Sequence, residues 1–287
     1  MFAVFKKEFK SFFCGVTGPL FIAFLLCFAG IYVTSINLRG GYASFEYVLS
    51  NIVIVFLLIV PILTMRVFAE ERHSKTDQLL YSLPISVSEF VLGKYFAMLA
   101  VFAIPVAIMA LYPVILSSFG PVAYRSAYLA LFAFFMLGAA LIAICMFMSS
   151  ITESQVISAV ISFGVLLLAY MMSGISSLVP STSAASLSCF AVLAGVIAFV
   201  FYLFTKNTTL SVGVLAALLA VIAVLYVLFT DSFAGLFPSV LTYLAVFDRF
   251  VSLTDGIFDV TAVVYLLSVA VFFVFLTVQS VEKRRWS

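Results

Sequence analysis

Residues 126–152, SAYLALFAFFMLGAALIAICMFMSSIT, contain no Asp, Glu, Lys, Arg or His. About 20 apolar residues in a helix are enough to cross the hydrocarbon core of a bilayer. A charge at the centre of such a helix costs about 2.5 to 3.5 kcal/mol, whereas a Leu, Ile, Phe or Val gains only about 0.3 to 0.6 kcal/mol. The absence of charge therefore predicts that this run spans a membrane.

Other parts of the chain share this property. Five further charge-free runs cover residues 11–38, 95–124, 154–205, 207–230 and 260–281. The chain is 66% hydrophobic and 9% charged, with a mean hydropathy of +1.31, whereas soluble domains carry about 25% charged residues. These values exclude a single water-soluble core and predict an all-α, polytopic integral membrane protein.

We expect about eight spans, because the run 154–205 is too long for one helix and contains Pro180 in a Ser/Thr-rich stretch. The expected spans cover about 15–36, 47–68, 89–117, 126–149, 154–178, 183–204, 208–230 and 259–280. With both termini in the cytoplasm, most basic residues fall on the inner side, as the positive-inside rule requires. The inner ones are Lys6, Lys7, Lys10, Arg66, Arg72, Lys75, Lys94, Lys206, Lys283, Arg284 and Arg285; the outer ones are Arg39, Arg125 and Arg249.

Residues 1–14 are predicted to form an amphipathic helix on the inner membrane surface. At 100° per residue, one stripe of this helix is aromatic and the opposite side is charged. The stripe contains Phe2, Phe5, Phe9, Phe12 and Phe13, and the opposite side contains Lys6, Lys7, Glu8 and Lys10. The alternative is a short extension of the first span. We expect that span to remain attached, because it exceeds the 7 to 15 apolar residues of a signal peptide.

Residues 232–258 are too apolar for an ordinary outer loop and too short to span, so they predict an outer interfacial helix or loop. Such a helix could act as a lid on a transport pathway, or it could simply anchor the last span. The sequence leaves both interpretations open.

The most polar segment between spans is AEERHSKTDQLLYSLPIS, residues 69–86, which the topology places in the cytoplasm. Ser74 and Asp77 fit a capping box that starts a helix over about 75–82, and the Leu83-Pro84 pair ends it. Ser86 and Glu89 fit a second box at the start of the third span. The leucines of this helix either dock into a groove of another protein or pack on the protein's own spans.

The segment 64–95, TMRVFAEERHSKTDQLLYSLPISVSEFVLGKY, resembles the signature of ABC-2-type permeases, in particular the gliding-motility-type and copper-maturation-type branch. The matching residues are Ala69, Glu70, Glu71, Arg72, Thr76, Leu79, Leu80, Pro84, Gly93 and Lys94. Lys75 stands where glycine is usual, and Gln78 where glutamate is usual. The resemblance extends to both ends of the chain but not to 181–230, which reads as an additional two-span hairpin in a single ABC-2-type domain over 1–287.

The resemblance implies that the segment 69–86 is a cytoplasmic coupling helix between spans 2 and 3, seated in a groove of a separate ABC ATPase. Its implied contact residues are Glu70, Glu71, Arg72, His73, Lys75, Thr76, Asp77, Gln78, Leu79, Leu80, Leu83 and Pro84. It also implies two ATPase copies, a second permease chain that is identical or related, and ATP and Mg²⁺ held by the ATPase. A bacterial inner or plasma membrane is the expected location.

The sequence predicts no catalytic, cofactor-binding or metal site in this chain. Gly93-Lys94 lacks the other residues of a phosphate-binding loop, and His73 is the only histidine. The four cysteines have no CxxC spacing, and the scattered basic residues do not indicate nucleic acid as a partner. We therefore expect an exporter subunit for an amphipathic or lipidic substrate. The alternatives are an ATPase-driven scaffold or force-transmitting subunit, and an ion-coupled carrier.

Overall fold

The structure is a computed structural model that describes residues 1–75, 86–228, 233–254, 256 and 258–285. Every regular element within these residues is a helix. Among them, seven helical segments are long and apolar enough to cross a membrane, or up to eight if the helices over 236–244 and 246–254 count as one broken span. The prediction of an all-α multi-pass membrane protein is confirmed.

Seven of the expected spans coincide with these segments. The segments are Thr17–Arg39, Glu46–His73, Val87–Leu116, Tyr124–Ile151, Gln155–Leu178, Thr208–Leu228 and Val260–Arg284. The expected span over 183–204 coincides with helix α11 (Ser183–Thr205), whose described apolar part, Ser183–Phe199, is shorter than the other seven.

Three spans contain breaks that hydropathy does not predict. The first joins α2 (Thr17–Tyr32) to the π-helix η1 (Val33–Arg39). The third joins α7 (Val87–Met109) to α8 (Tyr112–Leu116), with Pro113 at the start of α8. The second consists of α3 (Glu46–Ile52), η2 (Val53–Val55), α4 (Phe56–Thr64) and α5 (Ala69–His73).

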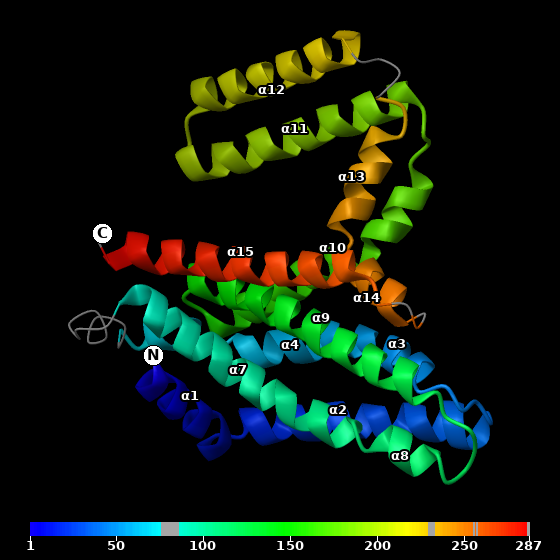
Figure 1. Cartoon of the computed structure of the whole chain (residues 1–287). Coiled ribbons are helices and arrows are strands. Elements are labelled where there is room, and N and C mark those ends of the chain that lie inside the picture. Colours follow the sequence, from blue (N-terminus) through cyan, green and yellow to red (C-terminus); the bar gives the residue numbers. More distant parts are fainter. Residues whose placement is uncertain (76–85, 229–232, 255, 257, 286–287) are drawn as a thin grey trace. The chain divides into compact units, whose positions relative to one another are not determined.

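The chain divides into two compact units, of which the first contains Met1–Leu168 and Val246–Ser287. Helix α9 (Tyr124–Ile151) lies at its centre and packs against α4, α7, α14 (Val246–Thr254) and α15 (Val260–Arg285) (Figure 1). Phe56, Phe102 and Phe134 form the aromatic core, with ring centroids 4.5 Å apart for Phe56 and Phe134 and 5.7 Å apart for Phe56 and Phe102. All three side chains are fully buried.

Helix α1 (Phe2–Cys14) packs along the start of α7 in this unit. The rings of Phe2, Phe5, Phe9 and Phe13 follow one another along α1, with centroids 6.1, 5.8 and 5.0 Å apart. Phe12, which the sequence assigned to the same stripe, is buried instead. It lies at the edge of the stripe, about 100° around the helix from Phe13, on the side that faces the protein's own helices.

The second unit, Ala169–Ala245, contains the region predicted as an added hairpin. Helices α11 and α12 (Thr208–Leu228) lie along each other (Figure 1). Helix α13 (Leu236–Leu244) packs on α11, where the ring of Phe237 meets that of Phe190 at 5.0 Å. Where an outer interfacial helix was predicted over 232–258, the described residues form two helices, α13 and α14, which meet at Ala245.

Candidate functional site

The predicted coupling segment begins as a continuation of the second span. Helix α5 carries Glu70, Glu71, Arg72 and His73, and Lys75 follows it. The hydroxyl of Ser74 donates to the carbonyl of Glu70 at 2.8 Å, and the backbone leaves the helical conformation at Lys75, whose φ is 54°. The remaining predicted contact residues, Thr76, Asp77, Gln78, Leu79, Leu80, Leu83 and Pro84, lie outside the described residues, so the helix over 75–82 and its capping box stay predictions.

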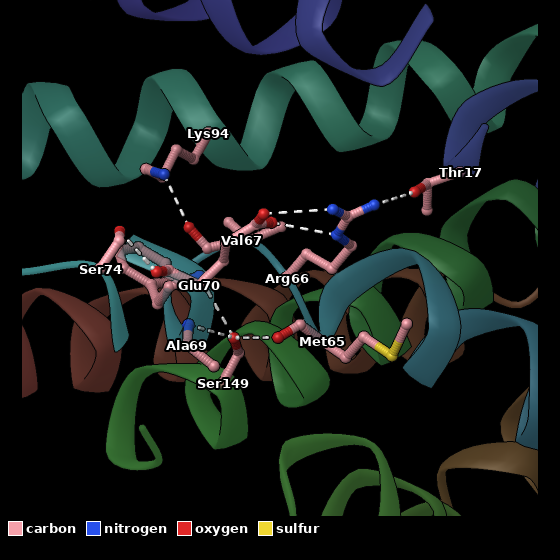
Figure 2. Close-up of polar contacts among 10 residues, drawn as sticks. Thr17, Met65, Arg66, Val67, Ala69, Glu70, Ser74, Lys94 and Ser149 are labelled. Carbon is pink, nitrogen blue, oxygen red and sulfur yellow. Dashed lines mark hydrogen bonds and ion pairs between the residues drawn. The ribbon is translucent and has the colours of Figure 1, made fainter. Parts of the chain in front are cut away.

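The break between α4 and α5 is held by Ser149 of α9. Its fully buried hydroxyl accepts from the backbone N–H groups of Phe68 and Ala69, both at 3.3 Å, and donates to the carbonyl of Met65 at 3.3 Å (Figure 2). A broken helix leaves backbone groups without partners, and leaving such groups unsatisfied in an apolar environment is costly. Ser149 therefore fixes the point at which the second span enters the polar segment.

Lys94 is the buried cation of the site, because its side chain is only 1% exposed. Its ammonium donates to the carbonyl of Val67 at 2.7 Å and lies 2.9 Å from the carboxylate of Glu71 and 3.4 Å from that of Glu8. It also lies about 5 Å from the ring centroids of Phe68 and Phe90. A buried charge persists only when it is paired and hydrogen-bonded. Lys94 therefore joins α1, the end of the second span and the start of the third.

Arg66 and Glu70 form a more exposed pair beside this cation. The guanidinium donates two hydrogen bonds to the Glu70 carboxylate, at 3.0 and 3.1 Å, and a third to the hydroxyl of Thr17 at 3.1 Å (Figure 2). The two side chains are 42% and 47% exposed. Exposed pairs add little stability, so this pair orients the ends of the first two spans rather than holding them together.

Gly93 explains how α1 comes so near to α7. A Cβ atom on Gly93 would lie 2.9 Å from the Cβ of Val4 and 3.1 Å from the carbonyl oxygen of Met1. Glycine thus permits the close approach, and Lys94, the next residue, secures it through Glu8. α1 therefore docks on the third span at the Gly93-Lys94 pair, a short distance after its start at Val87.

The predicted N-cap at Ser86 is confirmed, since its hydroxyl accepts from the backbone N–H of Glu89 at 3.3 Å. The Glu89 carboxylate lies 3.4 Å from the amine of Met1. α7 thus begins with a side-chain cap and a contact to α1.

Another ion pair joins Glu153, between α9 and α10 (Gln155–Leu178), to Arg284 near the end of α15. The hydrogen bond and the charge of Arg284 lower the pKa of Glu153, and the charges of Arg72 and Lys75 lower it further. Stability from a lowered carboxyl pKa is present above the ordinary glutamate pKa and is lost as the pH falls through the lowered value. Both side chains of the pair are partly exposed, so the pair adds little stability. The positive charges of Arg72, Lys75 and Arg284 all act on the Glu153 carboxylate.

The predicted contact residues thus differ in where they lie. Glu70, His73 and Lys75 are exposed. Glu71 is 16% exposed and faces Lys94, and Arg72 is buried. The side chains of Glu71 and Arg72 therefore lie against the protein's own helices, whereas the sequence predicted that their charges surround a docking surface.

Sequence reasoning missed the roles of Glu8, Lys94 and Ser149. A lysine within the first turns of an apolar span is a signal that could have marked Lys94, because charge there requires a partner. Nothing in the sequence pairs Lys94 with Glu8 or Ser149 with Met65, since those contacts depend on helix packing.

A family model described as ABC-2 family transporter protein matches residues 3–185. The matched range includes α1 and the first five expected spans. It also includes Lys94 and its two ion-pair partners, Glu8 and Glu71. It ends as α11 begins, and so excludes most of the predicted hairpin 181–230 and the last span. Neither the curated proteins nor the solved structures contain a match to the chain.

Proposed function

The chain belongs to the ABC-2 transporter family, and we propose that it is the membrane-spanning permease subunit of an ATP-binding-cassette exporter. A separate ATPase subunit binds ATP and Mg²⁺, and two copies of it serve a pair of permease chains. The pair, of identical or related chains, forms the pathway at its interface. The complex lies in a bacterial inner or plasma membrane, with both termini of this chain in the cytoplasm.

In this proposal the ATPase contacts the segment 69–86 through the exposed Glu70, His73 and Lys75 and through residues 76–84. The observation that supports it is the anchoring of both flanks of this segment: Ser149 fixes its entry, and Lys94 joins the entry at Glu71 to the exit through α7. If the ATPase displaces an anchored segment, the attached spans move with it, whereas a flexible loop would move without them. Nucleotide would bias the inward-facing and outward-facing states through this contact.

Leu79→Asp is expected to abolish most ATPase docking, because a carboxylate replaces an apolar side chain that would enter a groove. Pro84→Ala is expected to weaken docking by loosening the end of the helix. The measurement is co-purification of the tagged chain with the ATPase encoded beside it, with bound partner and ATP hydrolysis both recorded. Full retention of the ATPase by both variants would refute the docking segment.

Asn207→Asp is the matched control for Leu79→Asp. It adds one negative charge to the other polar loop that the topology places inside. It also preserves a helix cap, since the Asn207 side chain accepts from the backbone N–H groups of Thr209 and Leu210 and aspartate caps equally well. We expect the ATPase to remain bound to this variant.

We propose that the cargo is amphipathic or lipidic, because the expected spans place almost no charge at mid-membrane depth. Hydrophobic and amphipathic candidates are therefore expected to stimulate ATP hydrolysis by the reconstituted complex. Stimulation confined to a strongly charged small solute would contradict this. Movement of the cargo across sealed vesicles separates an exporter from a scaffold that uses the same ATPase contact.

A further inference from the structure

A cavity of about 400 Å³, lined by both charged and apolar residues, lies among α1, the start of α2, the junction of α4 and α5, and α7. Its charged lining consists of Lys7, Glu8, Arg66, Glu70, Glu71 and Lys94. We propose that this cavity binds the headgroup of a phospholipid that carries both a phosphate and a primary ammonium. The inference does not rest on ATPase coupling or on the identity of the cargo.

The position of the cavity suits a headgroup. Thr17, which lines it, is the first residue of the first candidate span, and Arg66 and Glu70 lie in the last turns of the second. The cavity therefore lies at the depth where the apolar spans give way to polar residues, which is where lipid headgroups lie. Its volume falls within the about 300 to 1,000 Å³ of small-molecule sites.

The nearly buried charges of the lining, which we call the floor of the cavity, are Glu8, Glu71 and Lys94, and they pair with one another. Glu8 and Glu71 are only 12% and 16% exposed, and both face the buried ammonium of Lys94. Lys94 also donates to the Val67 carbonyl. A ligand charge gains little from groups that are both paired and nearly buried, so we assign recognition to the exposed residues of the lining, which we call the mouth of the cavity.

The most exposed cation of the mouth, Lys7, has hydrogen-bonding capacity to spare. Lys7 is 62% exposed, and its ammonium lies 3.6 Å from the Glu8 carboxylate and 3.8 Å from that of Glu71. Within the described part of the chain, both distances exceed that of a hydrogen bond, so the three N–H donors can turn to phosphate oxygens. The hydroxyls of Ser11 and Thr17 also line the cavity.

The mouth also presents a carboxylate, that of Glu70. Each oxygen of Glu70 accepts one hydrogen bond from Arg66, which leaves lone pairs for a second donor such as a primary ammonium. The cavity as a whole carries three cations and three carboxylates. This balance favours a zwitterionic headgroup over an anionic one, because a phosphate can contact Lys7 while an ammonium takes the Glu70 lone pairs that Arg66 leaves open, whereas an anion without an ammonium gains only the first contact.

The test measures lipid retention by the purified full-length chain in detergent. The chain is incubated with equal amounts of phosphatidylethanolamine, phosphatidylcholine and phosphatidylglycerol of identical acyl chains, and retained lipid is quantified by mass spectrometry. We expect roughly tenfold preference for phosphatidylethanolamine, which corresponds to one charge-assisted hydrogen bond. Phosphatidylcholine has the same phosphate but no N–H donor, and phosphatidylglycerol has no ammonium.

Two variants test the phosphate contact and the ammonium contact separately. Lys7→Gln is expected to lower phosphatidylethanolamine retention roughly tenfold, and Glu70→Gln is expected to remove the preference over phosphatidylglycerol. Lys10→Gln is the control, because this exposed lysine lies on the same helix but does not line the cavity. Equal retention of the three lipids by the wild-type chain, or no response to Lys7→Gln, would overturn the proposal.

Soluble O-phosphoethanolamine separates a lipid ligand from a free one. Displacement of the lipid by this compound would show that the headgroup alone is the ligand. Retention that it does not displace, with the same lipid preference, would assign the site to the intact phospholipid. Both results support recognition of a phosphate paired with an ammonium.

Discussion

Lys94→Met is expected to lower the apparent melting temperature of the purified protein by on the order of 10 °C. The substitution removes the ammonium that lies 2.9 Å from Glu71 and 3.4 Å from Glu8, and leaves these two nearly buried carboxylates with only the more distant, exposed ammonium of Lys7. Breaking a buried pair by removing one partner costs about 3 to 5 kcal/mol. The measurement is the fraction of monodisperse protein after heating, followed by size-exclusion chromatography.

The double variant Lys94→Met with Glu71→Gln distinguishes loss of a charge partner from loss of packing. It removes one of the two stranded carboxylates, so we expect it to be more stable than Lys94→Met alone. Lys10→Met is the control, because it removes an exposed lysine from the same neighbourhood. If Lys94→Met melts like this control, the cation does not hold α1 to the spans.

Gly138→Ala is expected to destabilise the core of the first unit by about 1 to 3 kcal/mol, although alanine ordinarily favours a helix. The new methyl group would lie 2.3 Å from Cε1 and 2.4 Å from Cζ of Phe102. That ring cannot move aside, because it is fully buried and lies within 5.7 Å of the Phe56 centroid and 5.6 Å of the Phe135 centroid. Heating in detergent, as for Lys94→Met, measures the effect.

Two further variants test this explanation. Gly164→Ala makes the same chemical change in a candidate span where no atom lies within 4 Å of the new Cβ, so no loss is expected. Combining Gly138→Ala with Phe102→Leu is expected to cost less than the sum of the two single changes, because the smaller side chain makes room for the methyl group. If the free-energy costs of the two single changes simply add in the double variant, the alanine methyl group does not clash with the Phe102 ring.

Hydropathy predicted the fold class and the spans, because the free energy of transferring a span into the membrane depends on the residues of that span alone. The breaks inside spans escaped this reasoning for a physical reason. The break after Thr64 is stabilised by Ser149, a residue more than eighty positions away, and neither stretch looks unusual by itself. The π-helix over Val33–Arg39 likewise has no marker in its composition.

The candidate site could be located from the sequence, but its internal contacts could not. The motif placed Glu70 to Lys94 in one region and identified the capping serine at position 86. It could not show that Glu71 turns inward to Lys94 while Glu70 stays exposed, since adjacent residues of a helix point about 100° apart and packing decides which one is buried. Phe12 was misassigned for the same reason.

The contact between Glu8 and Lys94 also constrains the order in which the protein assembles during synthesis. Chains emerge from the ribosome with the N-terminus first. Helix α1 therefore leaves the ribosome well before Gly93 and Lys94 exist to receive it, and the first two spans must insert meanwhile. During that interval α1 can contact the first span through α2 but not α7, so we expect the bilayer surface to hold its row of phenylalanines until the third span is made.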